Sequence, residues 1–258
     1  MITESFDPHS PAIIGPEQAI PAGVRALARD FKLHSFIVFF SRQLLDLLTE
    51  SGEVELLHPE LTIGNAAGMH PIYRLKGTDI GVALSAIGSP AAAAELEELA
   101  VLFPVRRFIV FGSSGALVPL PPGALILPTA AVRDEGTSYH YLPASEEIPI
   151  PEAAKLAELL TELGVPYVPG KTWTTDAFYR ETEGNLRRRI GQGCICVEME
   201  CSAMQAVCRF RGLALYPFLY SADSLHGTWD RRILGHREKD SRLSYFALAR
   251  EIALRLQD

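Results

Sequence analysis

Residues 194–211, CICVEMECSAMQAVCRFR, decide the fold of this chain. The segment opens with four apolar residues, the length of a buried strand. It then places Glu198, Met199 and Glu200 together and continues into residues 202–207, which have the composition of a helix. Carboxyl groups at such a turn are costly to bury without partners. They either complement the dipole of a helix N-terminus or belong to a functional site.

Two other apolar runs are also followed by polar residues. GSSG (112–115) follows the run at 108–111, and Asp223 follows the run at 213–220. Ligands of open α/β sheets bind beyond the carboxyl ends of the strands. Three polar strand ends therefore favour a shared pocket over three unrelated turns.

The order of the motifs resembles that of the nucleoside phosphorylase family, which includes purine and uridine phosphorylases and related nucleosidases. The motifs are IGSP (87–90) with EEL (97–99), GSSGA (112–116), RDEGTSYH (133–140), TDAFY (175–179), VEME (197–200) and SAD (221–223). Each motif has low specificity, but their order and spacing match from about residue 36 to the C-terminus. The resemblance implies a single-domain three-layer α/β/α fold with a central mixed, partly barrel-like sheet. Residues 1–34 would form an N-terminal arm, and residues 35–258 the catalytic domain.

Composition limits the classes of partner. The chain has 258 residues, 48% of them hydrophobic, and a net charge of −7. This length can bury a large core, and the negative charge argues against a nucleic-acid polymer or an anionic membrane as the main partner. Because no apolar run approaches the length of a membrane span and the N-terminus lacks a basic-then-apolar signal, we expect a cytoplasmic protein.

All four cysteines lie in one segment, at positions 194, 196, 201 and 208. No second cluster is available to pair with them. We therefore interpret them as buried free thiols in a reducing compartment, and we predict no metal site.

The resemblance implies a base-binding end. Phe178 would stack on the nucleobase, as aromatic rings do; the alternative is a core phenylalanine. Uridine phosphorylases follow this residue with a glutamine and an arginine that bind uracil, whereas this chain has Thr182 and Gly184 there. Asp223 stands where purine-specific relatives have an aspartate, so we expect a purine nucleoside as the small-molecule substrate.

The resemblance also implies a ribose end. Glu200 would bind the ribose hydroxyls, with Met199 packed on the sugar and Glu198 beside them. His9, in an arm broken by prolines, is either solvated or reaches the ribose bound by a neighbouring subunit. We therefore expect a homo-oligomer, as a dimer, trimer or hexamer. Sugar hydroxyls or phosphate would be bound by backbone N–H groups and hydroxyls of Gly88, Gly112, Ser113 and Ser114.

The phosphate end departs from the family. Phosphorylases carry a Gly-Asp-Pro-type turn and an arginine after the first strand, where this chain has FFSRQ (39–43). Arg42 is either a replacement cation in a shifted register or a surface arginine. Two further arginines of the family are replaced by NAAG (65–68) and by Val110. Gln43, near the glutamate that activates water in nucleosidases, cannot act as a general base.

Three functions stay open. Glycosidic cleavage passes through an oxocarbenium-like state, which needs negative charge (Glu200), a proton donor to the base (Asp223) and a nucleophile. We favour a nucleoside phosphorylase, a pentosyltransferase that forms base and ribose 1-phosphate. Inorganic phosphate would be its co-substrate, held by Ser113, Gly88 and Arg42, and no cofactor is expected. The alternatives are a hydrolytic nucleosidase and a nucleoside-binding protein without turnover.

Overall fold

The computed structural model describes residues 1–65, 68–234 and 239–256. The substitution of a family arginine by NAAG falls partly outside them, at residues 66–67. The strands are β1 (Ser35–Phe39), β2 (Val54–Leu56), β3 (Thr62–Asn65), β4 (Gly68–Pro71), β5 (Tyr73–Leu75), β6 (Ile80–Leu84), β7 (Arg107–Ala116), β8 (Leu125–Asp134), β9 (Glu147–Pro149), β10 (Val168–Thr175), β11 (Cys194–Glu198) and β12 (Ala214–Ser224). The α-helices are α1 (Pro16–Ala19), α2 (Ala22–Ala28), α3 (Arg42–Glu50), α4 (Ser89–Leu102), α5 (Ala153–Glu162), α6 (Glu183–Gly191), α7 (Cys201–Arg211) and α8 (Lys239–Arg255). Short 3-10 turns, η1 (Ile2–Glu4), η2 (Thr137–His140) and η3 (Phe178–Arg180), complete the chain.

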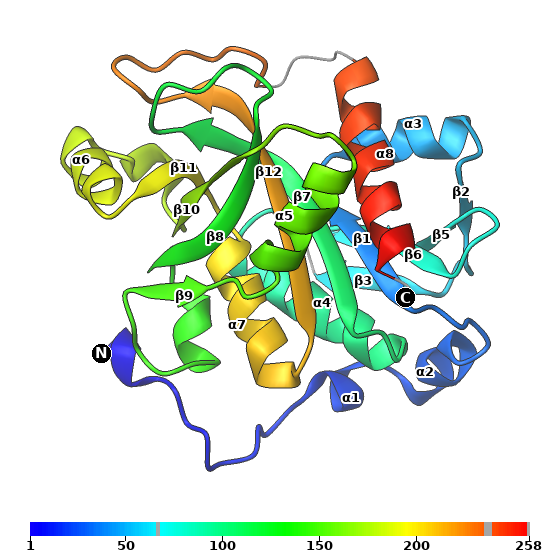
Figure 1. Cartoon of the computed structure of the whole chain (residues 1–258). Helices are drawn as coiled ribbons and strands as arrows, with labels where there is room; N and C mark the ends of the chain where they lie inside the picture. The colour runs from blue at the N-terminus through cyan, green and yellow to red at the C-terminus, as the bar shows by residue number, and fades with distance from the viewer. Residues whose placement is uncertain (66–67, 235–238, 257–258) are drawn as a thin grey trace.

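A mixed sheet with the order β11-β10-β8-β12-β7-β1-β6-β5-β2 forms the centre of the molecule (Figure 1). Strand β11 also pairs with β7, in antiparallel register, and this pairing closes β7, β12, β8, β10 and β11 into a barrel. The other strands extend from β7 as an open sheet. The predicted α/β class, with a central mixed and partly barrel-like sheet, is confirmed.

Strand β1 shows why the sheet is covered on both faces. Ile37 and Phe39 pack into a core formed with α3, α5 and α8, whereas Phe36 and Val38 pack into a core formed with α4 and α7. A strand buried on both faces has a continuous apolar sequence, as this one does. On the neighbouring strand, a Cβ at Gly81 would lie 2.3 Å from the Phe36 ring, so only glycine fits there.

The helix boundaries follow the sequence signals. Ser41 Oγ accepts a hydrogen bond from the Leu44 N–H and caps α3. Helix α7 ends at Gly212, whose φ of 67° is the left-handed conformation that glycine adopts readily. In the N-terminal segment, α2 places Ala28 in the core beside α4. The division into an arm and a catalytic domain stays a prediction.

Two features of the fold are not apparent from the local sequence. GSSG (112–115) is not a loop beyond a strand: it continues β7, because β12 pairs alongside it with Leu219 opposite Gly112 and Ser221 opposite Ser114. The arginines at 187–189 are not all solvated, because Arg189 is 6% exposed. Its guanidinium lies 3.0 Å from the Asp134 carboxylate and 5.5 Å from the centre of the Trp173 ring.

Candidate functional site

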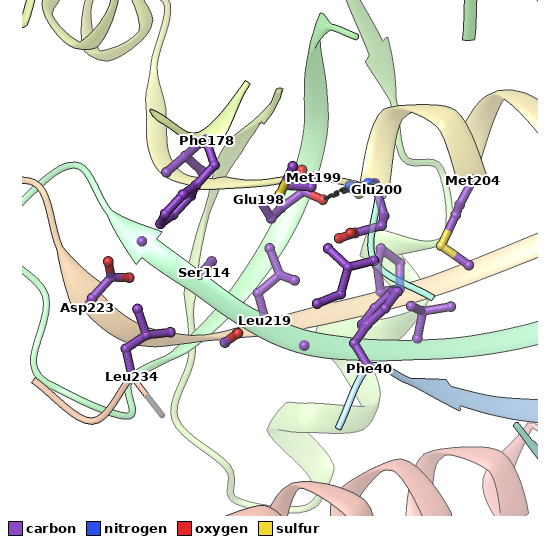
Figure 2. A pocket seen from close by; sticks show the side chains of 18 of the residues that line it. Phe40, Ser114, Phe178, Glu198, Met199, Glu200, Met204, Leu219, Asp223 and Leu234 are labelled. Atoms are coloured by element: carbon purple, nitrogen blue, oxygen red, sulfur yellow. Dashed lines mark hydrogen bonds between the residues drawn. The ribbon is translucent and has the colours of Figure 1, made fainter. Parts of the chain in front are cut away.

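A cavity of about 230 Å³ opens at the carboxyl ends of β7, β11 and β12. Figure 2 shows Phe178 and Asp223 toward one end and Glu200 with Phe40 toward the other. Apolar side chains of Val110, Met204 and Leu219 line much of the wall between them. The three polar strand ends singled out in the sequence therefore do meet in one pocket.

Glu198 is buried and accepts four hydrogen bonds. Two come from the hydroxyls of Thr172 and Thr174, at 3.1 and 2.6 Å. Two come from the backbone N–H groups of Glu200 and Cys201, at 2.8 and 2.6 Å. Its carboxylate thus joins the end of β10 to the first turn of α7 and fixes the turn that carries Met199 and Glu200.

Glu200 is the second buried acid of this turn, and its carboxylate reaches across to α4. The Gly88 N–H donates to Glu200 Oε1 at 2.6 Å, and the Ser89 hydroxyl donates to the Met199 carbonyl oxygen at 2.7 Å. Gly88 has a φ of 103°, which favours glycine at this approach. Helix α4 therefore supports the turn from outside the cavity.

The surroundings of the two carboxyl groups favour different protonation states. Burial, and then the charge of Glu198, raise the pKa of Glu200 to about 8. Burial also raises the pKa of Glu198, but its four donors favour the ionised form. Glu198 is therefore the better carrier of the negative charge, and the raised pKa of Glu200 favours its protonated form near neutral pH.

At the opposite end, Phe178 and Asp223 line the cavity together. Phe178 is 43% exposed, so it is available for stacking and is not a core phenylalanine. Burial raises the pKa of Asp223, while the Trp229 indole N–H, which donates to Asp223 Oδ2 at 2.9 Å, opposes the shift. Asp223 is thus a buried carboxyl group beside an exposed aromatic ring.

Glu181 is a further acid in the cavity wall that sequence reasoning missed. Burial, and then the charge of Asp223, raise its pKa to about 7. The sequence signal was weak, because Glu181 follows Phe178 on an irregular turn and its neighbour Asp223 lies on a distant strand. The end of the cavity at Phe178 therefore contains two carboxyl groups instead of one.

The residues at the glycine- and serine-rich end of β7 have different roles. Ser113 is exposed in the cavity, whereas the Ser114 hydroxyl donates to the Tyr220 carbonyl oxygen at 3.2 Å. Gly112 lines the wall with its backbone. At Gly115, a Cβ would lie 2.6 Å from Leu225 and 3.3 Å from Asp223 Oδ1, so glycine leaves room for the acid.

Three residues assigned from the sequence lie elsewhere. Arg42 is exposed on the first turn of α3 and is not among the described residues that line the cavity. Gly88 directs its N–H to Glu200 instead of a ligand. Neither residue is among the described residues that line the cavity, and the assignment of both to phosphate stays a prediction. His9 is exposed in the N-terminal segment and lies outside the cavity wall of its own chain, so its role at a neighbouring subunit stays a prediction.

The described residues give no group of three or more His, Cys, Asp or Glu side chains that could hold a metal ion. All four cysteines are buried and free, as expected. Within the described part of the chain, no helix is both long and apolar enough to cross a membrane.

The sequence matches one protein family model and several curated proteins. The model of the phosphorylase superfamily matches residues 36–243. The uridine phosphorylase of Thermococcus kodakarensis is 41% identical over 111 residues, which cover 41% of this chain and 39% of that protein. The guanosine phosphorylase of Halorubrum lacusprofundi is 32% identical over 146 residues, covering 53% and 58%. The uridine phosphorylase of Escherichia coli is 28% identical over 160 residues, covering 54% and 61%. In each of these comparisons the matched segment spans less than two thirds of the relative.

Solved structures share the fold at low identity. The AMP nucleosidase of Bacteroides thetaiotaomicron superposes with a TM-score of 0.66 and 20% identity, over 90% of this chain and 91% of that one. The purine nucleoside phosphorylase of Toxoplasma gondii, in complex with immucillin-H, gives a TM-score of 0.69 and 23% identity, over 90% and 94%.

Proposed function

The chain belongs to the phosphorylase superfamily, and on that basis we propose that it is a nucleoside phosphorylase that acts on purine nucleosides. One observation carries the proposal. One end of the cavity has a buried acid with Met199, and the other has an exposed aromatic ring with a second buried acid. These two ends match the two halves of a nucleoside.

In the proposed reaction, an oxygen of inorganic phosphate forms a bond to C1′ of the ribose while the bond from C1′ to N9 breaks. The electron pair of that bond stays with the purine. Asp223, protonated, donates its proton to N7, so the base leaves as a neutral molecule. The products are the free base and ribose 1-phosphate, and the Asp223 carboxylate regains a proton from solvent.

Glu200 would accept hydrogen bonds from the ribose hydroxyls, and Met199 would pack against the sugar. As the glycosidic bond breaks, positive charge develops on the ribose. This charge favours the ionised form of Glu200, so the interaction strengthens in the transition state and accelerates the reaction. Glu198 holds the turn in place through its four hydrogen bonds.

The choice of a purine rests on Asp223. Burial raises its pKa, which favours the neutral form that can donate to N7. Uracil offers no such acceptor at that position, and Thr182 and Gly184 replace the side chains that bind uracil in uridine phosphorylases. Guanosine is named for one similar protein and uridine for others, and Asp223 is the residue of this chain that favours the purine.

The test is an incubation of the protein with adenosine, guanosine, inosine and uridine, each with and without inorganic phosphate. The amount of released base is measured by chromatography. We expect release that requires phosphate and is faster for the purines. Release without phosphate would identify a hydrolytic nucleosidase instead, and binding without release would identify a nucleoside-binding protein.

We also propose a homo-oligomer. Ile87, which lines the cavity, is 67% exposed, and Tyr179, beside the lining residue Phe178, is 92% exposed. A second copy of the chain that covers this region would bury them and bring another N-terminal segment close. Sedimentation at micromolar concentration should give a dimer or larger. A monomer would contradict the oligomer and any role of His9 at a neighbour.

A further inference from the structure

The segment that follows β12 folds back along the end of that strand. The Ser224 N–H donates to the Asp230 carbonyl oxygen at 2.9 Å, and the Asp230 N–H donates to the Ser224 carbonyl oxygen at 2.8 Å. Further on, the Ile233 N–H donates to the Ala222 carbonyl oxygen at 2.9 Å. The loop is therefore closed at its base by backbone hydrogen bonds, and it carries Trp229 directly before Asp230.

This loop brings the Trp229 indole to Asp223. The indole Nε1–H donates to Asp223 Oδ2 at 2.9 Å. The ring is 62% exposed, and Trp229 is not among the described residues that line the cavity. Burial therefore contributes little to the position of the ring, and the hydrogen bond links it to an acid of the cavity wall.

The two oxygens of Asp223 have different neighbours. Oδ2 faces the Trp229 N–H, whereas Oδ1 lies beside Gly115 in the cavity wall, where a Cβ would approach it to 3.3 Å. An indole N–H is only a donor, so the Oδ2 lone pair that faces it has to stay an acceptor. A neutral Asp223 is therefore favoured to carry its proton on Oδ1.

The chain contains a second indole that makes the same bond in another setting. Trp173 and Trp229 are its two tryptophans. The Trp173 Nε1–H donates to Asp134 Oδ2, also at 2.9 Å. Trp173 is 1% exposed, and Asp134 is not among the described residues that line the cavity. The bond of Trp173 thus belongs to the core, whereas the bond of Trp229 reaches an acid of the site.

The charged side chains near Asp223 come from two segments. Glu181 lies on the turn after β10, and the negative charges of Glu181 and Asp223 oppose each other. Within the loop, Asp230 favours the neutral form of Asp223 and Arg232 favours the ionised form. Residues without a titrating group surround Oδ1 on β7, on β11 and in the loop, namely Gly115, Val197 and Leu225.

We propose that Trp229 is a positioning residue for the proton transfer to the base: its N–H occupies Oδ2 of Asp223 and directs the acid proton to Oδ1, from which it passes to N7 of the purine. This inference rests on the proposed function, in which Asp223 is the proton donor. Trp229 itself gives up no proton. Its N–H stays on Oδ2 and stabilises the carboxylate that remains after the transfer.

The test compares Trp229→Phe, which keeps an aromatic ring and removes the N–H, with Trp173→Phe as the matched control. Both kcat and KM are measured for guanosine with inorganic phosphate from about pH 5 to about pH 9. Trp229→Phe is also made in the Asp223→Ala background, because the double-mutant cycle isolates the coupling between the two residues. The melting temperature of each variant reports whether it is folded.

We expect Trp229→Phe to lower kcat for guanosine ~10-fold, part of the ~100-fold that a general acid supplies, with KM almost unchanged. The carboxylate of Asp223 loses a donor, so the pKa of Asp223 rises further. Because the reaction needs the protonated acid, the fall of kcat/KM at high pH should move to higher pH. Trp173→Phe should keep the wild-type pH profile, and in Asp223→Ala the loss of the Trp229 N–H should have no further effect.

Fluorescence tests the contact without turnover. In Trp173→Phe, Trp229 is the only tryptophan left in the chain. Its emission should change with pH as Asp223 ionises, because the charge appears on the group that accepts the indole N–H. Adding Asp223→Ala should remove this change.

The inference is overturned if Trp229→Phe keeps the kcat and the pH profile of the wild type, or if it lowers kcat equally in the Asp223→Ala background. A rise in KM alone would also overturn it, because the loop would then only cover the ligand. Base release that does not need phosphate would contradict the proposed phosphorylase and leave the Trp229 effect standing, since the departing base needs a proton in either reaction. The two proposals therefore fail separately.

Discussion

The proposed ribose end and the proposed base end of the cavity are built in opposite ways. At the ribose end, Glu198 and Glu200 lie two residues apart and are held by backbone N–H groups of the same turn and of α4. At the proposed base end, Phe178 and Glu181 come from the turn after β10, whereas Asp223 comes from β12. The first end is fixed by one local motif, and the second depends on how that turn lies against β12.

The two acids of the ribose end also differ from each other. Glu198 has its hydrogen bonds satisfied within the protein, which suits a structural role. Glu200 has a raised pKa and faces the cavity, which suits a role toward a ligand. The predictions below test that separation, from the largest expected effect to the smallest.

Glu200→Gln should abolish turnover and leave the fold intact. The amide keeps an acceptor for the Gly88 N–H but cannot supply negative charge to the transition state. We expect kcat to fall by ~1000-fold or more, about 4 kcal/mol. Glu183→Gln, on the exposed face of α6, is the matched control. Turnover within ~10-fold of wild type would remove Glu200 from the mechanism.

Asp223→Ala should lower purine turnover far more than uridine turnover. The purine loses its proton donor, an effect of about 100-fold in kcat/KM for a general acid, whereas uracil loses no comparable contact. The measurement is kcat/KM for guanosine and for uridine in wild type and variant. Asp230→Ala, whose side chain is exposed, serves as control. Equal losses for both bases, or a wild type that prefers uridine, would make Asp223 a structural residue that holds the loop before Trp229.

The stability of the protein should depend on pH through Glu200. Its pKa is 4.5 in an unfolded chain and about 8 in the folded protein, so the folded state binds more protons between these values. Glu200 therefore adds to the free energy of unfolding at low pH, and this contribution is lost as pH rises through about 8. Each pKa unit corresponds to about 1.4 kcal/mol, so the change amounts to a few kcal/mol.

The measurement is the urea unfolding midpoint of wild type and Glu200→Gln from about pH 5 to about pH 9. Because glutamine does not titrate, the variant should gain stability relative to wild type as pH rises. A constant difference across this range would show that Glu200 is ionised in the folded protein throughout.

Glu198→Gln should destabilise the fold where Glu200→Gln does not. The amide nitrogen of the new glutamine would face N–H and O–H donors that need an acceptor. Leaving such a buried donor without an acceptor costs about 1–3 kcal/mol. The melting temperatures of the two variants, compared at pH near 6, give the contrast. Equal melting temperatures would contradict the structural role that we assign to Glu198.

The sequence predicted the local parts of this molecule well. The buried strand that opens residues 194–211 and the strand-to-helix turn around Glu198 each depend on neighbouring residues, and the structure has both, as β11 and the start of α7. The closure of the barrel through β11 and β7 gave no local signal, because it is a pairing between distant strands. The same holds for Glu181, which becomes relevant only when the fold brings it to Asp223. Arg42 was the plausible cation in sequence, but the first turn of α3 directs it to solvent.

The most direct test of the account is phosphorus NMR of a reaction with guanosine, inorganic phosphate and the wild-type protein. The account predicts that the phosphate signal decreases as a signal of ribose 1-phosphate grows, in equal amounts with released guanine. Guanine released with free ribose and no loss of inorganic phosphate would contradict it, and would show that water is the nucleophile.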